Sequence, residues 1–533
     1  MTDMRWSGWG ADADRMTLSD QVLGLLRQGL GVTPEAMRSV SVDEVELPDS
    51  ALSSAAAEAF GAVVGADQVR TDRDARLLHV GGRSTVDLWR RRAGDASDAP
   101  DAVVLPGSHD EVLGVLRVAS EHGVAVVPFG GGTSVVGGVE PDRGGFGSVV
   151  ALDLRRLDGL VEVDEVSMTA RLEPGLRGPD AERLLAEHGL TLGHFPQSFE
   201  YASIGGFAAT RSAGQASSGY GRFDDLVVAM RIATPSGSLD LGRAPASAAG
   251  PDLRQLFLGS EGALGVITEV TVRVRPAPAE VRDETWAFTD FAAGADAVRR
   301  LAQSGSLATV TRLSDEAETA VNLAMGRDAG TPSPANGGCL LIIGHEGTPS
   351  QVASARAATT EVLTAVGGRS LGADASHGWR TGRYQGPYLR DALLDAGAQV
   401  ETLETATSWS RLDRLYAAVR DAITASLTAA GTPPLVLCHL SHAYPTGASL
   451  YFTVVAKAAD DPIAQWTAAK HAAGHAIAAE GGTITHHHAV GLDHRDWMEA
   501  EIGTLGLAVL RSVKETLDPA GILNPGKLLP PPD

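Results

Sequence analysis

The chain has 533 residues, of which 44% are hydrophobic, and a formal net charge of −22 at pH 7. This length predicts about three domains with cores of ordinary size, which is enough for an enzyme with a cofactor. The acidic charge and the lack of a basic stretch argue against a nucleic-acid-binding protein.

The apolar segments argue against a membrane-spanning or secreted protein. No window approaches the roughly 20 apolar residues of a membrane span, and the start of the chain lacks a signal-peptide core. Cys339 and Cys438 stand alone in apolar surroundings, which predicts buried free thiols and suits a reducing compartment. We therefore expect a cytoplasmic protein without an integral membrane segment.

Residues 1–95 predict an N-terminal helical segment in which Trp6 and Trp9 act as packing anchors. From residue 96 the pattern becomes β-α-β. A strand over 102–105 precedes a helix that Ser108 and Glu111 open as a capping box and that ends at Gly123. A β-branched strand over 124–127 follows, and a glycine-rich loop comes directly after it.

The glycine-rich loop indicates a binding site formed by backbone. Its residues are Pro128, Phe129, Gly130, Gly131, Gly132, Thr133 and Ser134. Glycines let several N–H groups converge on one anion, so a phosphate or pyrophosphate is the expected guest. No lysine follows for a Walker loop, and Val135 stands where a Rossmann turn needs its last glycine, so ATP and NAD are disfavoured. A mobile linker stays open from the loop alone.

Two further stretches of small residues, 197–214 and 259–268, complete a domain over 96–276. Together with the loop they resemble the FAD-binding domain of the vanillyl-alcohol oxidase family, also called PCMH-type, which has two α+β subdomains. The resemblance implies dissociable FAD, because Thr133 stands where some relatives carry a flavin-linked histidine. The implied FAD contacts outside the loop are Gln197, Ser198, Phe199, Glu200, Tyr201, Ala202, Ser203, Thr210, Arg211, Ser212, Ala213, Glu261, Gly262, Ala263, Leu264, Gly265, Val266 and Ile267.

The rest of the chain predicts an α+β cap domain over 277–485. Two β-α-β units, at 285–312 and 339–371, favour a ferredoxin-like sheet. Strands over 435–442 and 449–455 and a helix over 462–479 follow. The C-terminal segment 486–533 is expected to return to the flavin domain and close the active site.

Three adjacent histidines, His486, His487 and His488, are the most conspicuous chemical feature. On an extended strand only His486 and His488 would lie on the same face, so a metal would need a ligand from elsewhere. A plain histidine cluster and acid/base or oxyanion chemistry are the other interpretations, and acid/base chemistry is favoured.

Over nearly its whole length the chain resembles the alkyldihydroxyacetonephosphate synthases. The similar segments are the tryptophan-rich start, the flavin stretches, 311–315, 387–391, 404–409, Tyr444 and the triple histidine. The resemblance implies exchange of the acyl group of acyl-dihydroxyacetone phosphate for a fatty alcohol, in ether-lipid synthesis. It implies Tyr444 as general acid/base, Arg390 on the substrate phosphate, and Arg312 with the three histidines in support of turnover.

Two alternatives stay open. The first is an FAD-dependent oxidase or dehydrogenase of a soluble 2-hydroxy acid such as lactate or glycolate. Those enzymes carry acidic metal ligands that are missing around His442 and His488, so no metal site is expected. The second is a non-catalytic flavin-binding module. The expected partner is a small-molecule or lipid substrate, with peripheral membrane contact left open and a homodimer as the default.

Overall fold

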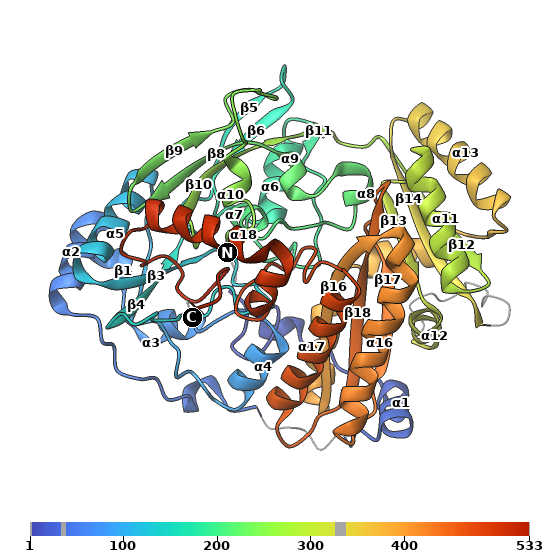
Figure 1. Cartoon of the computed structure of the whole chain (residues 1–533), viewed down its shortest axis with the longest axis horizontal. Helices are drawn as coiled ribbons and strands as arrows, with labels where there is room; N and C mark the ends of the chain where they lie inside the picture. Colours follow the sequence, from blue (N-terminus) through green and yellow to red (C-terminus); the bar gives the residue numbers. More distant parts are fainter. Residues whose placement is uncertain (1–2, 34–38, 326–336, 532–533) are drawn as a thin grey trace.

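The structure is a computed structural model that describes residues 3–33, 39–325 and 337–531. Three sheets dominate it (Figure 1). Two belong to the N-terminal domain on the left of the view, and one belongs to the cap domain on the right. The α+β class predicted from the sequence is confirmed.

The first sheet has the order β1-β2-β4-β3 and delivers the glycine-rich loop. Its strands are β1 (Val69–Arg70), β2 (Ala102–Val104), β3 (Val124–Phe129) and β4 (Ser148–Asp153). The strands β2, β4 and β3 are parallel, and α5 (His109–His122) connects β2 to β3. The loop therefore leaves the carboxyl end of a parallel strand, where ligands of such sheets usually bind.

Helix α5 begins and ends at the predicted residues. The Ser108 hydroxyl accepts the N–H of Glu111, and Gly123 ends the helix in the left-handed conformation with φ 64°. The predicted capping box is only half formed, because the Glu111 carboxylate accepts the N–H of Gly107 at 2.7 Å.

The N-terminal segment contacts both domains: α2 (Ser54–Val64) and α3 (Arg73–Leu78) pack beside this sheet, whereas α1 (Asp20–Leu30) and α4 (Thr85–Arg92) pack against the cap domain. Trp9 is buried and packs edge-on against Tyr201, with ring centroids 5.4 Å apart. The Trp6 indole donates to the carbonyl of Arg91 at 3.1 Å. Both tryptophans therefore make the packing contacts that the sequence predicts.

The second sheet is antiparallel with the order β5-β6-β10-β8-β9. Its strands are β5 (Leu160–Asp164), β6 (Thr169–Leu172), β8 (Val227–Thr234), β9 (Gly237–Leu241) and β10 (Val266–Arg273). The two-stranded pair β7 (Leu190–Thr191) and β11 (Arg275–Pro276) lies beside it. The connecting helices are α6 (Gly178–Ala186), α7 (Ile204–Ala209), α8 (Ser217–Tyr220), α9 (Phe223–Leu226) and α10 (Arg254–Phe257).

The cap sheet has seven strands in the order β15-β12-β14-β13-β17-β18-β16. They are β12 (Glu280–Phe288), β13 (Val310–Ser314), β14 (Cys339–Gly347), β15 (Arg369–Gly372), β16 (Ala398–Ser408), β17 (Leu435–Leu440) and β18 (Gly447–Lys457). Its first four strands form the predicted ferredoxin-like arrangement. The strands β17, β18 and β16 repeat this order for three of the four positions. The fourth position, next to β16, holds only an isolated bridge between Thr483 and Ala406.

One face of the cap sheet holds the core and the other faces the N-terminal domain. Four helices share the core cluster with the strands: α11 (Phe291–Ser304), α13 (Pro349–Ala365), α16 (Leu412–Ala429) and α17 (Pro462–Ala479). On β17, Val436, Cys438 and Leu440 point into this core, while Leu437 and His439 line a cavity on the opposite face. Three more helices are α12 (Glu316–Ala324), α14 (Asp374–Gly382) and α15 (Gly386–Asp395).

The C-terminal segment returns to the N-terminal domain, as predicted. Helix α18 (Met498–Leu517) crosses back in Figure 1, where the segment is red. Leu523 then bridges Val126 of β3, and the Asn524 side chain donates to the carbonyls of Gly138 and Glu261. The end of the chain therefore contacts the glycine-rich loop region directly.

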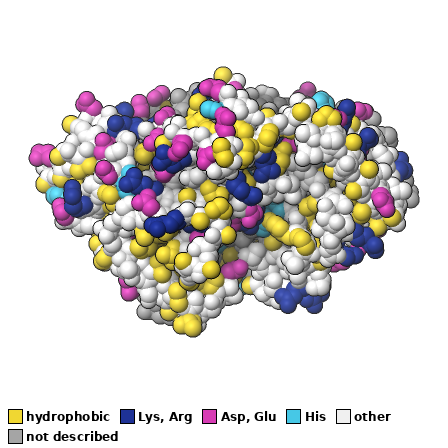
Figure 2. Space-filling model, turned by 90° about the horizontal axis from the view of Figure 1, so that it is seen from above, with side chains coloured by type: hydrophobic (Ala, Val, Ile, Leu, Met, Phe, Trp, Pro, Cys, Tyr) yellow, Lys and Arg dark blue, Asp and Glu magenta, His cyan; other side chains and the backbone are white. Residues whose placement is uncertain are grey.

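Cys339 and Cys438 are buried and free, as predicted. Within the described ranges, no helix has the length and apolar character needed to cross a membrane. On the face shown in Figure 2, acidic, basic and hydrophobic side chains are interspersed.

Candidate active site

A cavity of about 780 Å³ lies between the N-terminal domain and the cap sheet. Its size is typical of sites for large organic ligands. The predicted site residues that line it are Pro128, Phe129, Gly130, Gly131, Gly132, Thr133, Ser134, Gln197, Ser198, Ala202, Ser203, Thr210, Ser212, Ala213, Glu261, Gly262, Gly265, Val266, Ile267, Arg312, Arg390, His487 and His488.

The glycine corner, residues 130–132, is a cradle in which side chains would not fit. A Cβ atom at Gly131 would lie 2.0 Å from the carbonyl oxygen of Tyr201, and one at Gly130 would lie 2.3 Å from the Ser203 hydroxyl. Gly132 has a φ of 65°, which favours glycine. Among the described residues, no partner takes up the N–H groups of Gly131, Gly132 and Thr133. These donors fit a diphosphate, and the small residues around them leave room for a flat ring system.

Six of the predicted FAD contacts do not line the cavity, because their side chains have partners elsewhere. Arg211 pairs with Asp224 at 2.9 Å, and Glu200 accepts from the hydroxyl of Tyr388 at 3.2 Å. The others contact aromatic rings or the core of the N-terminal domain: Phe199 stacks on Tyr384, Tyr201 packs on Trp9, and Ala263 and Leu264 are core residues. At Tyr201 the carbonyl group, rather than the ring, abuts the glycine corner.

The histidine loop, residues 485–488, is held by one buried carboxylate. Glu404 on β16 accepts the backbone N–H groups of His486, His487 and His488 at 2.6, 3.2 and 3.0 Å and the Thr485 hydroxyl at 2.6 Å. Burial alone would raise the pKa of Glu404, but the neighbouring imidazoles and these donors hold it well below its usual range. Glu404 is therefore an ionised anchor.

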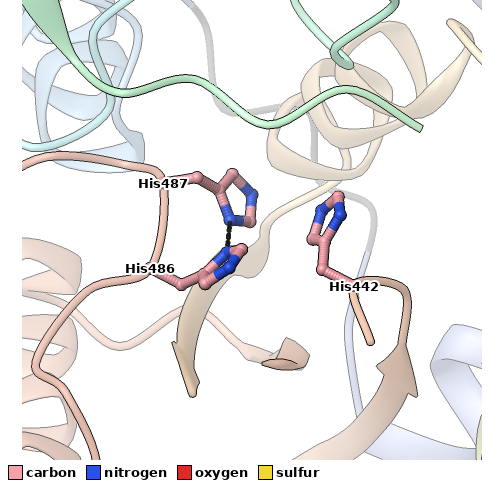
Figure 3. Close-up of side chains that lie close together, drawn as sticks. All are labelled: His442, His486 and His487. Carbon is pink, nitrogen blue, oxygen red and sulfur yellow. Dashed lines mark hydrogen bonds between the residues drawn. The ribbon is translucent and has the colours of Figure 1, made fainter. Parts of the chain in front are cut away.

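The histidine loop is bent rather than extended, which corrects the predicted alternation of side chains. His486 and His487, rather than His486 and His488, are in contact, with their Nδ1 atoms 2.9 Å apart (Figure 3). His442, which precedes the turn before β18, points toward this pair from the other side. Burial lowers the pKa of His442, His486 and His487 well below the usual value, so all three rings are neutral at pH 7.

Tyr444 lies behind the histidine pair. Its hydroxyl is 2.7 Å from Nε2 of His486. Burial raises the pKa of Tyr444 to about 12, while the charge and hydrogen bond of Arg222 act in the opposite direction. Neither Tyr444 nor His486 is among the described residues that line the cavity, whereas His442 and His487 are.

The three facing histidines do not form an open metal site. Ligand nitrogens of His442, His486 and His487 lie within 4.8 Å of one another, close enough for an ion to bridge. Both ring nitrogens of His486 are already hydrogen-bonded, one to Tyr444 and one to His487. A metal ion would have to break one of these contacts.

Two predicted arginines, Arg312 and Arg390, line the cavity, and each contacts a carboxylate. Arg312 pairs with Glu318 at 2.5 Å, and the same carboxylate lies 3.2 Å from Nδ1 of His439. Arg390 donates to the carbonyl of Arg83 at 2.7 Å and makes longer contacts, 3.3 and 3.4 Å, to Asp391.

Part of the cavity lining is apolar and forms an apolar arm. It is formed by one side of α1, by α15 and by the inward-facing residues of β17 and β18. Its apolar lining residues are Val22, Leu25, Leu26, Leu30, Leu389, Leu393, Leu435, Leu437 and Val455.

Comparison with known proteins agrees with this geometry. Residues 100–241 match the family described as FAD binding domain, and residues 277–528 match the C-terminal domain of FAD linked oxidases. The chain is 35% identical to the alkyldihydroxyacetonephosphate synthases of Trypanosoma brucei brucei and Dictyostelium discoideum, over 88% and 87% of its length and 80% and 79% of theirs. The chain belongs to the alkyldihydroxyacetonephosphate synthase family. FAD is therefore its cofactor.

Solved structures support the assignment. An alkyldihydroxyacetonephosphate synthase superposes with a TM-score of 0.85 at 30% identity, covering 99% of both chains. The p-cresol methylhydroxylase structure, at 17% identity and a TM-score of 0.68 over 89% of this chain and 96% of its own, shares the fold. The PCMH-type fold predicted from the sequence is thereby confirmed.

Sequence reasoning missed four residues of this synthase-family site: Arg222, Glu318, Glu404 and His442. Glu404 lies on β16 and Glu318 on α12, and a carboxylate on a strand or helix normally faces solvent. His442 stands two residues before Tyr444. This spacing puts both side chains on the same face of an extended segment, and it could have indicated that His442 lies near Tyr444.

The glycine corner gives a testable prediction. In Gly131→Ala, relief of the clash with the Tyr201 carbonyl costs about 1–3 kcal/mol, and we expect FAD to bind roughly 5- to 150-fold more weakly. Titration of the apoprotein with FAD, followed by flavin fluorescence, measures this. Gly147→Ala is the matched control because a Cβ there meets no atom within 4 Å. Unchanged affinity in Gly131→Ala would contradict the assignment of the corner.

The neutral histidines predict a loss of stability in acid. Their folded-state pKa values lie below the unfolded value of about 6.5, so the unfolded chain binds more protons below that pH. Stability is complete above pH about 6.5 and falls as the pH decreases, by up to about 1.4 kcal/mol per pH unit for each histidine. Depression of the Glu404 pKa adds a further loss below pH about 4.3.

Thermal unfolding between pH about 7.5 and about 5.5 checks this sign. His442→Gln should flatten the pH dependence of Tm, whereas the exposed His475 on α17, changed to Gln, serves as the control. A Tm that rises on acidification would show that the buried histidines are charged in the folded protein.

Proposed function

We propose that the protein is an FAD-dependent alkyldihydroxyacetonephosphate synthase. It would exchange the acyl group of acyl-dihydroxyacetone phosphate for a fatty alcohol and release a fatty acid, as a step of ether-lipid synthesis. The observation that carries this proposal is the composition of one cavity. Its lining combines a glycine corner for a diphosphate, arginines and imidazoles, and an apolar arm.

The residues of each region match one part of the reactants. The N–H groups of Gly131, Gly132 and Thr133 would hold the FAD diphosphate. When bound, FAD supplies an isoalloxazine ring that can act as electron sink or as nucleophile. The apolar arm would hold the acyl and alkyl chains, since each buried CH₂ contributes about 0.8 kcal/mol.

Arg390 would bind the substrate phosphate. Its guanidinium lies on the cavity wall beside Leu389 and Leu393 of the apolar arm. One nitrogen donates to the carbonyl of Arg83, but the contacts to Asp391 are long, so the other donors could bind a phosphate, which accepts two parallel hydrogen bonds from one guanidinium.

Proton transfer would involve the hydrogen-bonded unit of Tyr444 and His486. A phenol with a pKa of about 12 is a weak acid at pH 7, so its deprotonated form needs local stabilisation. The positive charge of Arg222 beside the hydroxyl provides it. The exchange has no net oxidation, so no electron acceptor is required.

A cytoplasmic location, a homodimer and peripheral membrane contact stay predictions. An oxidoreductase acting on a 2-hydroxy acid is the alternative reaction, since a plant D-lactate dehydrogenase [cytochrome] is 29% identical over 87% of this chain.

The exchange reaction is tested directly. FAD-loaded protein is incubated with acyl-dihydroxyacetone phosphate and a long-chain alcohol, and fatty acid release and alkyl product are measured by mass spectrometry. We expect release that depends on the alcohol. Bleaching of the flavin by D-lactate or glycolate without alcohol-dependent release would assign the protein to the dehydrogenase chemistry.

The role of Arg390 gives a second prediction. Arg390→Gln should weaken transition-state binding of the phosphate substrate by about 1.5–3 kcal/mol, lowering kcat/KM by roughly 10- to 150-fold. Steady-state kinetics measures this, and FAD content should be unchanged. Arg420→Gln on the outer surface of α16 is the control. An unchanged kcat/KM in Arg390→Gln would place the phosphate elsewhere.

A further inference from the structure

The N-terminal turn, residues 5–10, lies against the cap helix that carries Arg390. The backbone N–H of Arg5 donates to the carbonyl of Gly10 at 2.8 Å and closes the turn. Gly10 has a φ of 71°, and a Cβ atom there would lie 2.5 Å from the ring of Tyr388 on α15. Trp9 is itself part of the cavity lining. The start of the chain therefore contacts both the cavity and α15.

Asp391 on α15 is the residue that the N-terminal turn holds. Its carboxylate is fully buried, and Oδ2 accepts hydrogen bonds from Nη2 of Arg5 at 2.9 Å and from the backbone N–H of Trp9 at 2.5 Å. The other oxygen, Oδ1, faces Nε and Nη2 of Arg390 at 3.4 and 3.3 Å. The short hydrogen bonds of this carboxylate thus go to the turn, and its contacts with the neighbouring Arg390 are weak.

Arg390 is held on its other side by the carbonyl of Arg83, which accepts from Nη1 at 2.7 Å. The backbone N–H of Arg83 donates in turn to the carbonyl of Ser134 in the glycine-rich loop, at 2.6 Å. The Arg83 guanidinium is buried, and its hydrogen bonds to described residues go to the carbonyls of Gly82 and Arg5. Arg83 thus adds a positive charge beside Arg390, which a phosphate would complement.

A carboxylate beside Arg390 is a competitor of the phosphate. A guanidinium forms two parallel hydrogen bonds with a carboxylate as readily as with a phosphate. A buried carboxylate that loses its partner pairs with another cation, because an unpaired buried charge is costly. Among the described residues, the guanidinium besides Arg5 that contacts the Asp391 carboxylate is that of Arg390.

On the basis of the proposed function above, we propose that Arg5 is a positioning residue for Arg390. By pairing with Asp391, it keeps this carboxylate from closing a tight ion pair with Arg390, whose donors stay available to the substrate phosphate. The N–H of Trp9 acts on the same oxygen in the same way. The N-terminal turn is thereby a part of the substrate site that acts through Asp391.

The turn also has a route to the cofactor site, which decides the choice of variant. Trp9 packs edge-on against Tyr201, and the carbonyl of Tyr201 abuts Gly131 of the glycine corner. A change at Trp9 would therefore disturb both sites. Arg5 points at Asp391 instead, so a change at Arg5 tests the phosphate site alone.

Binding of the alkyl-dihydroxyacetone phosphate product to FAD-loaded protein tests the role of Arg5. Calorimetric titration measures Kd, and alkyl-dihydroxyacetone serves as the ligand without a phosphate. In Arg5→Met the Asp391 carboxylate should pair with Arg390, so we expect the phosphate ligand to bind about 5- to 20-fold more weakly. The affinity for the phosphate-free ligand and the FAD content should stay unchanged. Arg70→Met, which removes a surface pair with Asp72, is the control.

A double variant separates positioning from a structural role. In Arg5→Met/Asp391→Asn the competing carboxylate and its cation are both removed, so affinity for the phosphate ligand should return to within about threefold of the wild type. Structural damage would instead accumulate. Unchanged affinity in Arg5→Met, loss of FAD from it, or still weaker binding in the double variant would overturn the proposal.

The binding experiment and the exchange assay keep the two hypotheses separate. If wild-type protein lacks the exchange reaction but shows the expected binding pattern, the proposed function fails and the role of Arg5 stands. If the exchange reaction is present and Arg5→Met binds the phosphate ligand normally, the function stands and the role of Arg5 fails. Wild-type protein that does not bind the phosphate ligand would overturn both.

Discussion

Two buried carboxylates, one from each domain, hold the segment that carries the active-site histidines. Glu404 of the cap domain accepts the N–H groups of residues 486–488. Glu261 of the N-terminal domain accepts those of Val490 and Gly491 at 3.1 and 2.7 Å. An irregular segment at a domain boundary has no ladder partners for its N–H groups, and each one left unsatisfied costs about 1–3 kcal/mol. The two carboxylates accept hydrogen bonds from these N–H groups and thereby fix the segment relative to both domains.

Glu261 also connects the histidines to the cofactor site. It has a φ of 52°, lies in the loop that lines the cavity, and its side chain abuts Gly138 so closely that a Cβ there would be 2.4 Å away. Burial raises the pKa of Glu261 to about 7, against the effect of its two backbone donors. Asn524 adds a further link, because its side chain donates to the backbone of both residues. Cofactor loop, histidine segment and C-terminus thus share one hydrogen-bond network.

The sequence predicted features whose signal is local. Helix α5 carries its cap, its apolar face and its terminal glycine within a short window. The glycine corner lies in a loop whose composition, together with the two later stretches of small residues, predicts a cofactor-binding site. The conformation of the histidine loop could not be predicted in this way. Its bend is held by Glu404, some 80 residues away in the chain, and not by the residues of the loop. The predicted alternation of His486 and His488 therefore failed. Likewise Arg211 and Tyr201 stand in a cofactor-binding stretch, yet distant partners turn their side chains away from the cavity.

The carboxylates behind the arginines explain how positive groups can line a partly apolar cavity. An unpaired guanidinium would be costly to bury, so Glu318 supports Arg312 and Asp391 supports Arg390. Burial opposes ionisation of Glu318, but Arg312 and His439 outweigh it and lower its pKa to about 2. The imidazoles stay neutral mainly because they are buried, and the positive charge of Arg222 lowers the pKa of His442, His486 and His487 further. A neutral histidine has both a proton and a lone pair, and this is the state in which a ring can both give and take a proton without the protein first having to stabilise a buried imidazolium.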